Sequence, residues 1–242
     1  MIRSDLIPVG STASRPKVCA VSYLNTVPLI WGALHGPQSG HLTLDFAVPS
    51  LCAEQVASGQ ADVGLVPVYE VDRLGLGYFS GLGIGCRGPV RSILLISKVD
   101  PRRIQRMAAD SGSRTSVQLA RVILAERYGA KPEIFPAAPD LESMLARADA
   151  ALLIGDAALR VDPVQVEALC LDLGEEWLSL TGLPMVFAVW AGRAAALTPA
   201  LESILIESAR FGLARLDEIA DAEAPLRGLA LPLVEQYLKS HI

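Results

Sequence analysis

The sequence is poor in the residues that build metal centres and disulfide frameworks. Its four cysteines, Cys19, Cys52, Cys86 and Cys170, lie far apart, and none has the Cys-x-x-Cys or Cys/His spacing of a zinc site. The three histidines have no partner at the spacing of metal ligands. We therefore expect no metal ion, and we expect the cysteines to be buried thiols of a protein in a reducing compartment.

Charged residues and long apolar runs are also scarce. Charged residues make up 19% of the 242 residues, and the net charge of −5 argues against nucleic acid and acidic membrane surfaces as partners. No stretch approaches the roughly 18 apolar residues that cross a membrane. Residues 1–16 lack the continuous apolar segment of a secretory signal. These absences predict a cytoplasmic protein that binds neither nucleic acid nor a membrane.

The sequence does contain a large apolar fraction, ordered as short runs that alternate with helical patterns. The hydrophobic fraction of 51% predicts a sizeable buried core. Strands are expected over residues 18–21, 41–48, 62–67, 90–97, 133–135, 150–154 and 184–190. Helices are expected over residues 27–34 and 49–58, after residue 67, starting at 101–106, from the 111–116 segment to 128, over 141–147, and twice between 199 and 242 with an interruption at Ala224-Pro225. This alternation predicts parallel strands and an α/β fold.

The chain is expected to form two α/β lobes with a cleft between them. No flexible linker separates its halves, so we expect ordinary strands to join the lobes, at residues 93–97 and 185–189. The first lobe is expected to comprise residues 1–97 with 190–242, and the second residues 98–189. Open α/β sheets bind ligands beyond the carboxyl ends of their strands, so the polar segments 22–26, 67–69, 111–116 and 155–156 are expected to line this cleft.

Residues 111–116, Ser-Gly-Ser-Arg-Thr-Ser, place hydroxyls and a guanidinium where a helical apolar pattern begins. Two interpretations are open. Ser113 or Thr115 is an ordinary helix cap and Arg114 is solvated. Alternatively, the unpaired N–H groups, the helix dipole and Arg114 form a pocket for a carboxylate or phosphate.

Several other polar residues follow strands or precede them. Asn25 either caps a helix or binds a substrate oxygen, and Asp156 is either a cap or a site residue. The glycine-rich segment 83–88 lacks the lysine of a phosphate-binding loop and precedes a strand, which excludes nucleotide binding. There is no Ser-His-Asp set and no obvious carboxylate pair. The residues by themselves indicate a two-lobed module that binds a small anion.

Seven short motifs occur together and in order, at residues 22–26, 64–68, 113–116, 154–156, 172–177, 181–184 and 187–190. As a set they resemble the MqnA family, the chorismate dehydratases of the futalosine pathway of menaquinone biosynthesis. The resemblance covers residues 17–193, and the tail matches only in its helical character. Three places depart from the family pattern: Met185, where phenylalanine is usual, and the segments 85–88 and 109–112.

This resemblance implies a two-lobed, type II periplasmic-binding-protein-like fold and a specific reaction. It implies that chorismate is dehydrated to 3-[(1-carboxyvinyl)oxy]benzoate without a cofactor. One route to proton removal uses the substrate's own enolpyruvyl carboxylate while the protein holds the geometry. The residue expected nearest the reacting atoms is Asn25. The residues expected to bind substrate are Tyr23, Ser92, Ser113, Arg114, Thr115, Ser116, Asp156, Thr181 and Gly182.

Two alternative functions remain open from the sequence. A non-catalytic solute-binding protein shares the expected fold and also binds small anions. The sibling enzyme that forms 1,4-dihydroxy-6-naphthoate needs a larger site and usually a histidine base. None of the three histidines lies in an expected cleft motif, which favours the dehydratase.

Overall fold

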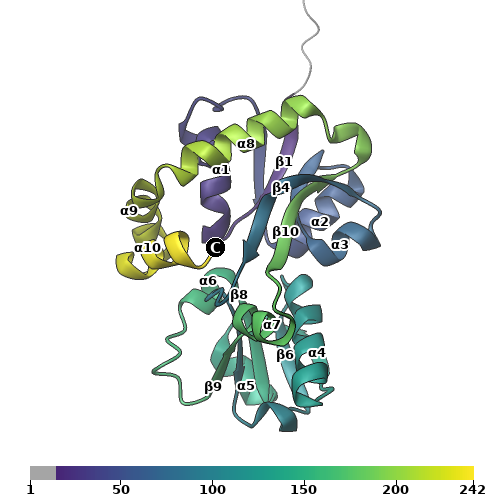
Figure 1. Ribbon diagram of the computed structural model, residues 1–242, viewed down its shortest axis with the longest axis vertical. Helices are drawn as coiled ribbons and strands as arrows, with labels where there is room; N and C mark the ends of the chain where they lie inside the picture. Colours follow the sequence, from purple (N-terminus) through teal and green to yellow (C-terminus); the bar gives the residue numbers. More distant parts are fainter. Residues whose placement is uncertain (1–14) are drawn as a thin grey trace, which may run out of the picture.

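The computed structural model describes residues 15–242, which form two α/β lobes, one above the other in Figure 1. The expectation that residues 1–16 contain no secretory signal falls largely on residues 1–14, which lie outside the described residues. Within residues 15–242, no helix is both long and apolar enough to span a bilayer.

The first lobe is built on a five-stranded sheet with the order β2-β1-β3-β10-β4. Its strands are β1 (Lys17–Val21), β2 (Thr43–Ala47), β3 (Val63–Pro67), β4 (Gly77–Cys86) and β10 (Met185–Gly192). Strand β1 runs parallel to β2 and β3, whereas β10 runs antiparallel to β3 and β4.

The second lobe has a sheet of the same size with the order β7-β6-β8-β5-β9. Its strands are β5 (Ile93–Ser97), β6 (Arg106–Asp110), β7 (Glu133–Ala137), β8 (Ala150–Ile154) and β9 (Leu169–Asp172). Strand β6 is parallel to β7 and β8, and β5 is antiparallel to β8 and β9. In the first lobe the parallel strands β2, β1 and β3 are followed in the sheet by the antiparallel strand β10. In the second lobe the parallel strands β7, β6 and β8 are followed by the antiparallel strand β5. The α/β fold class is confirmed, with mixed rather than wholly parallel sheets.

Helices pack against both sheets. In the first lobe they are α1 (Val27–His35), α2 (Pro49–Ser58), α3 (Val68–Arg73), α8 (Pro199–Leu213), α9 (Leu216–Arg227) and α10 (Leu231–Ser240), with the 3-10 helices η1 (Leu24–Thr26) and η3 (Ala194–Ala196). In the second they are α4 (Thr115–Tyr128), α5 (Leu141–Arg147), α6 (Gly155–Leu159) and α7 (Leu173–Thr181), with η2 (Pro101–Arg103). Helices α1 and α8 pack closely: Ala33 N–H donates to Ser208 Oγ at 3.0 Å, and a Cβ on Gly212 would lie 2.1 Å from the Pro28 carbonyl oxygen.

Local sequence signals explain where several of these helices begin and end. Helix α2 has Pro49 in its first turn, where a missing N–H costs nothing, and ends at Gly59 with a left-handed φ of 77°. The expected strand at 150–154 and helix at 141–147 coincide with β8 and α5.

Sheet pairing moves two segments across the division expected from the sequence. Strand β5 was placed in the first lobe, but it pairs with β8 and β9 of the second sheet. Residues 185–189 were placed in the second lobe, but they belong to β10 and pair with β3 and β4. The crossings therefore fall between Cys86 and Ile93 and between Thr181 and Met185. Both runs are mainly apolar, so their sequences do not indicate which sheet they join.

Several segments differ from the secondary structure expected from the sequence. The helix expected at 101–106 is only η2, and Arg106 begins β6. Strands β4 and β9 were not expected, and β4 runs through the glycine-rich segment. The tail forms three helices, and α9 continues through Pro225 instead of being interrupted there. The chain turns instead at Gly228, whose φ is 62°.

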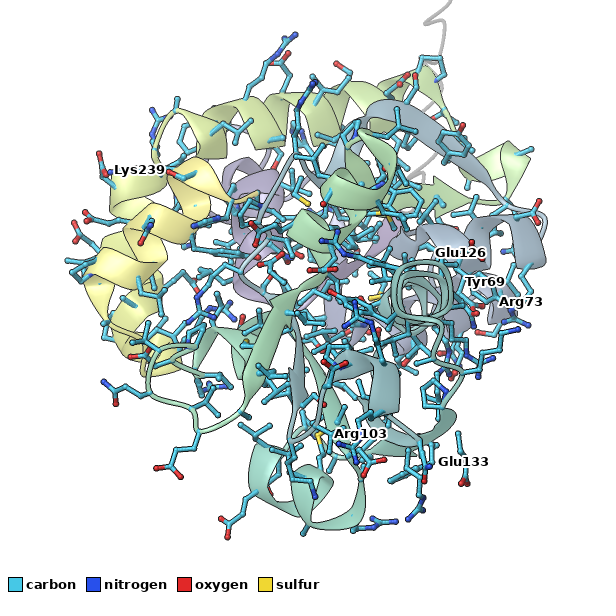
Figure 2. The ribbon with its side chains drawn as sticks, turned by 60° about the horizontal axis from the view of Figure 1, so that its bottom comes forward. Tyr69, Arg73, Arg103, Glu126, Glu133 and Lys239 are labelled. Carbon is cyan, nitrogen blue, oxygen red and sulfur yellow. The ribbon has the colours of Figure 1, made fainter. Side chains whose placement is uncertain are left out.

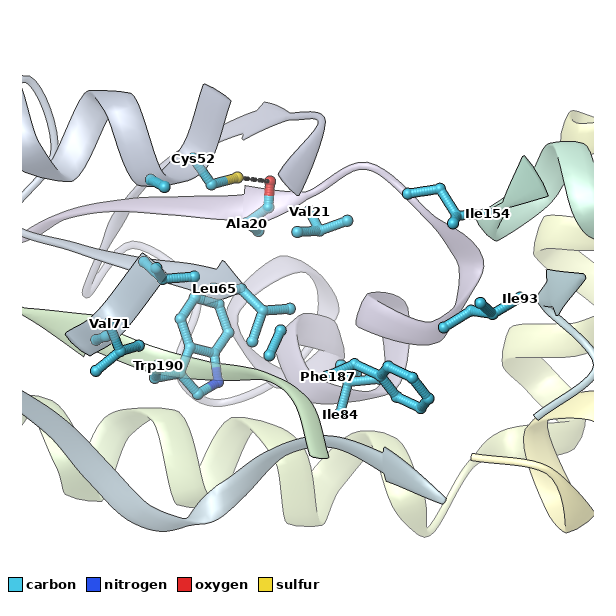
Figure 3. Close-up of a cluster of buried hydrophobic side chains, with 14 of the residues drawn as sticks. Ala20, Val21, Cys52, Leu65, Val71, Ile84, Ile93, Ile154, Phe187 and Trp190 are labelled. Atoms are coloured by element: carbon cyan, nitrogen blue, oxygen red, sulfur yellow. Dashed lines mark hydrogen bonds between the residues drawn. The ribbon is translucent and has the colours of Figure 1, made fainter. Parts of the chain in front are cut away.

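The largest cluster of buried side chains runs from the first sheet to the second. Figure 3 shows Val21, Leu65 and Phe187 of the first lobe approaching Ile93 and Ile154 of the second. All five are buried, and burying a large aliphatic or aromatic side chain stabilises the fold by about 1.5–3 kcal/mol. The apolar core thus extends to the boundary between the lobes.

Candidate active site

A pocket lies between the lobes, at the carboxyl ends of strands from both sheets. Residues that end or follow β1 and β3 form its first-lobe side, and residues that end or follow β6 and β8 form its second-lobe side. The pocket is narrow, with about 60 Å³ open to the centre of a water-sized sphere. Seven of the ten site residues expected from the sequence line it: Tyr23, Asn25, Ser92, Ser113, Arg114, Thr115 and Ser116.

The first turn of α4 faces this pocket without a side-chain cap. Arg114 occupies the cap position and makes no capping hydrogen bond. Thr115 Oγ1 instead accepts from the backbone N–H of Tyr69 at 3.3 Å, across the lobes. Neither Ser113 nor Thr115 therefore caps the helix. The unpaired N–H groups and the dipole of α4 favour an anion at this point.

Ser113 carries the strongest sign of a missing partner. Its side chain is 4% exposed, and its Oγ has no hydrogen-bond partner among the described residues. A buried hydroxyl without a partner costs free energy, so such groups need an explanation. A ligand oxygen in the pocket would satisfy it. Ser116, 5% exposed, lines the same side of the pocket.

Arg114 lines the pocket, but its guanidinium faces two carboxylates of the first lobe. It lies 3.7 Å from Glu54 on α2 and 4.0 Å from Glu70 on α3. Glu70 is buried and also accepts from Arg73 Nε at 2.8 Å. Tyr69 and Arg73 mark α3 in Figure 2, at the edge of the molecule where this helix meets α4. Arg114 thus links the lobes beside the pocket.

Tyr23 packs its ring against a glycine of the opposite lobe. A Cβ on Gly155 would lie 2.5 Å from the ring, so there is no room for a side chain. The φ of Gly155 is 58°, a left-handed conformation that also favours glycine. Burial, followed by the charges of Asp110 and Asp156, raises the pKa of the Tyr23 phenol well above its usual range. The phenol therefore stays protonated and is a hydrogen-bond donor near neutral pH.

Asn25 lies in η1 and is half-buried at the pocket. Its Oδ1 accepts from the Thr26 hydroxyl at 3.4 Å. The cap position of α1 is Thr26, and neither η1 nor α1 begins with a side-chain capping bond. Asn25 is therefore not a helix cap, and its carboxamide is placed to meet a ligand.

Three of the residues expected from the sequence lie away from the pocket lining. Asp156 accepts from the Leu24 N–H at 3.0 Å and pairs with Arg227 of α9, so it joins the lobes instead. Thr181 donates to the Trp177 carbonyl at 2.8 Å, and Gly182 ends α7 with a φ of 73°. Both of the latter are exposed. Thr181 and Gly182 form the end of α7, which lies outside the pocket lining.

The family model for menaquinone biosynthesis matches residues 16–241. This chain belongs to that family. The chain is 34% identical to the chorismate dehydratase of Thermus thermophilus, over 79% of this chain and 77% of the relative.

Solved structures support the fold of this family member. A protein from Archaeoglobus fulgidus matches it with a TM-score of 0.71 at 16% identity, over 94% of this chain and 88% of that one. The periplasmic aliphatic sulphonate binding protein of Escherichia coli matches with a TM-score of 0.61 at 14% identity, over 94% and 79%. At these identities the likeness concerns the fold alone, and it confirms the two-lobed, periplasmic-binding-protein-like architecture.

Sequence reasoning missed three polar residues that lie beside the pocket lining of this family member. Asp110 ends β6, accepts from the Gly112 N–H at 2.9 Å, and leaves its buried Oδ2 without a partner among the described residues. Burial raises the pKa of Asp110. The turn pattern Asp-Ser-Gly before a helix was an available signal for it. Glu70 and Tyr237 carry no local signal, because their importance comes from residues distant in the chain.

All four cysteines are free thiols, but only Cys19 and Cys52 are buried as expected, whereas Cys86 and Cys170 are half-buried. Burial raises the pKa of Cys86 to about 11, so its thiol is protonated near neutral pH. Across residues 15–242, no group of three or more histidine, cysteine or acidic side chains is arranged to hold a metal ion.

Proposed function

We propose that this protein is a chorismate dehydratase, a hydro-lyase that converts chorismate to 3-[(1-carboxyvinyl)oxy]benzoate and water in the futalosine pathway. Its family and its relative in Thermus thermophilus support this assignment. The observation that carries it is the pocket, which sets the uncapped first turn of α4 and the unpartnered Ser113 hydroxyl in the same apolar-walled space as Asn25.

Chorismate has two carboxylates and a hydroxyl on a cyclohexadiene ring, which becomes flat when water is lost. We assign one carboxylate to the N-terminal N–H groups of α4, with hydrogen bonds from Ser113 and Ser116. The ring would lie against the apolar wall, which includes Leu65, Ile84 and Phe187. The uncapped helix start and the apolar wall thus suit one carboxylate and the ring of this substrate.

The pocket supplies little protein acid–base chemistry. No histidine, lysine or carboxylate side chain is among the described residues that line it, and burial raises the pKa of the Tyr23 phenol, which stays protonated. We therefore assign the base to the substrate. Its enolpyruvyl carboxylate takes the proton from the ring carbon that bears the ether. The electron pair of that C–H bond forms the new ring double bond, the neighbouring C–O bond breaks, and the proton leaves with the hydroxide as water.

In this scheme the protein contributes orientation. Asn25 is neutral near pH 7 and can hold the carboxylate or the departing hydroxyl without titrating. The protonated phenol of Tyr23 lines the same pocket and can donate a hydrogen bond there. Good alignment contributes about 7–11 kcal/mol in favourable intramolecular reactions, and aromatisation of the ring supplies the driving force.

The test is to incubate purified protein with chorismate and follow the product by liquid chromatography and mass spectrometry. We expect a product lighter by one water, formed equally fast after dialysis against EDTA. Tight chorismate binding without turnover would identify a solute-binding protein instead. Turnover of a cyclic futalosine derivative, with chorismate inert, would identify the naphthoate-forming sibling enzyme.

A further inference from the structure

Asp156 and Arg227 form an ion pair between the lobes, beside the pocket but outside its lining. Asp156 lies in α6 of the second lobe, and Arg227 lies in the last turn of α9 in the first. Their side chains are only 14% and 16% exposed. Arg227 Nε also donates to Glu223 Oε2 at 2.7 Å, one turn earlier in α9. The guanidinium is thus held between two carboxylates.

Both side chains of this pair bond to the backbone on either side of Tyr23. Arg227 Nη1 donates to the Ser22 carbonyl at 3.0 Å. Asp156 Oδ1 accepts from the Leu24 N–H at 3.0 Å. Tyr23 is the cap residue of η1, and its side chain makes no capping bond, so the Leu24 N–H is one of the groups that a helix leaves unpaired at its start. A carboxylate of the second lobe therefore satisfies the start of a helix in the first.

The segment held in this way presents two side chains to the pocket. Tyr23 and Asn25 both line it. The Thr26 N–H donates to the Tyr23 carbonyl at 3.1 Å, which closes η1 around Asn25. Because this turn is one hydrogen-bonded unit, a shift of the backbone at residues 22–24 would move both side chains. Their placement therefore depends on an ion pair that lies outside the pocket.

Packing around α6 supports the ion pair. Leu159, which is 1% exposed, lies in one cluster with Leu24 of η1 and Ile219 of α9. Arg160 Nη2 donates to the Arg227 carbonyl at 3.1 Å. Buried apolar contacts thus hold α6 against η1 and α9, so the position of the pair does not depend on charge alone, as a positioning group requires.

We propose that Asp156 and Arg227 are positioning residues for the dehydration, a role that rests on the proposed function. They fix the backbone of residues 22–24 and so set where the Tyr23 phenol and the Asn25 carboxamide meet the substrate. Neither side chain lines the pocket, so both act through the segment that they hold. Because Asp156 comes from the opposite lobe, the segment has this geometry only where the lobes meet.

The first test compares Asp156→Ala with Glu176→Ala as a matched control. Glu176 on α7 is 12% exposed, lies 3.2 Å from Arg127 Nε and accepts from the Tyr128 hydroxyl at 2.9 Å. Both of these partners lie at the end of α4 away from the pocket. Each substitution thus removes a similarly buried carboxylate from one arginine and one further donor.

For Asp156→Ala we expect kcat to fall roughly 10- to 100-fold and KM to rise less than about threefold. The change in KM is small because the first turn of α4, to which we assign a substrate carboxylate, keeps its place. Glu176→Ala should keep both constants. Asp156→Asn retains an oxygen that can accept from the Leu24 N–H but carries no charge, so its kcat should lie between those of wild type and Asp156→Ala.

Hydrogen exchange tests the geometry without turnover. The bond to Asp156 protects the Leu24 amide, so a peptide covering residues 22–26 should exchange faster in Asp156→Ala and at the wild-type rate in Glu176→Ala. If Asp156→Ala does not fold, Asp156→Asn decides, and wild-type kcat in that variant would overturn the proposal.

Three results with folded Asp156→Ala would also overturn it: wild-type kcat, an equal loss of kcat in Glu176→Ala, or unchanged exchange of residues 22–26. A kcat of Asp156→Asn as low as that of Asp156→Ala would do the same. Wild-type protein that is inactive on chorismate, with the difference in exchange present, would instead refute the proposed function.

Discussion

Because the Ser113 hydroxyl has no partner, we expect it to lower the stability of the free protein and to raise the affinity for a ligand that bonds to it. Ser113→Ala removes a buried oxygen with no hydrogen bond to lose and no helix cap to break. An unsatisfied buried polar group costs about 1–3 kcal/mol. Because the loop partly relaxes, we expect the variant to gain about 1 kcal/mol, a rise in Tm of roughly 2–4 °C for a chain of this size.

The same substitution should weaken ligand binding. A hydrogen bond to a charged group contributes about 1.5–3 kcal/mol, which corresponds to roughly 10- to 150-fold in Kd. The assays are thermal unfolding of the free protein, titration calorimetry with 3-[(1-carboxyvinyl)oxy]benzoate, and KM for chorismate. Binding of the product is measured directly, so this result does not depend on turnover.

Ser97 offers a matched control in the same lobe. It is fully buried like Ser113, but its hydroxyl donates to the Val99 carbonyl at 2.8 Å and accepts from the Val99 N–H at 3.2 Å. Ser97→Ala should therefore lose about 1–2 kcal/mol of stability and leave Kd unchanged. If Ser113→Ala loses as much stability as Ser97→Ala and binds the product as wild type does, the hydroxyl is structural and our argument is wrong.

Three further substitutions test other parts of the site. Asn25→Ala should lower kcat by about 10²–10³-fold, or about 3–4 kcal/mol, while the product still binds, and Asn25→Asp should be at least as damaging; steady-state kinetics with wild-type kcat would refute the role. Gly155→Ala should lower the free energy of unfolding by about 1–3 kcal/mol and raise KM, because the added methyl group would clash with the Tyr23 ring. The control is Gly129→Ala, where φ is 68° and no atom lies within 4 Å of the added methyl group. It should lose only the roughly 1–2 kcal/mol that a left-handed backbone costs a residue with a side chain, as measured by urea denaturation. Burial raises the pKa of Asp110, so its contribution to stability is complete below the ordinary aspartate pKa and is lost as pH rises through the raised value. Asp110→Asn should match wild type in acid and exceed its free energy of unfolding near pH 7; a difference that is constant across pH would contradict this.

Local patterns in the sequence determined much of the fold. The apolar run at 150–154 and the helical period at 141–147 coincide with β8 and α5, because each depends on neighbours only a few residues away. The segment 111–116 was expected at a helix start in the cleft, and residues 113–116 of it line the pocket at the start of α4. Polar residues that follow a strand can be recognised from neighbouring residues, and the carboxyl ends of parallel strands lie at the same edge of a sheet, so such residues come close together.

Only the tertiary structure decided which distant residues meet. Strand β5 belongs to the second lobe because it pairs with β8, and neither strand's sequence indicates which strand it pairs with. Asp156 faces Arg227 rather than the pocket, and Tyr237 reaches Ser92 from a tail with no motif. Such contacts join residues 71 and 145 positions apart, so they depend on how helices α9 and α10 pack against the lobes. Packing is a property of the whole core, whereas periodicity and capping belong to a few neighbouring residues, and only the latter can be predicted from one sequence.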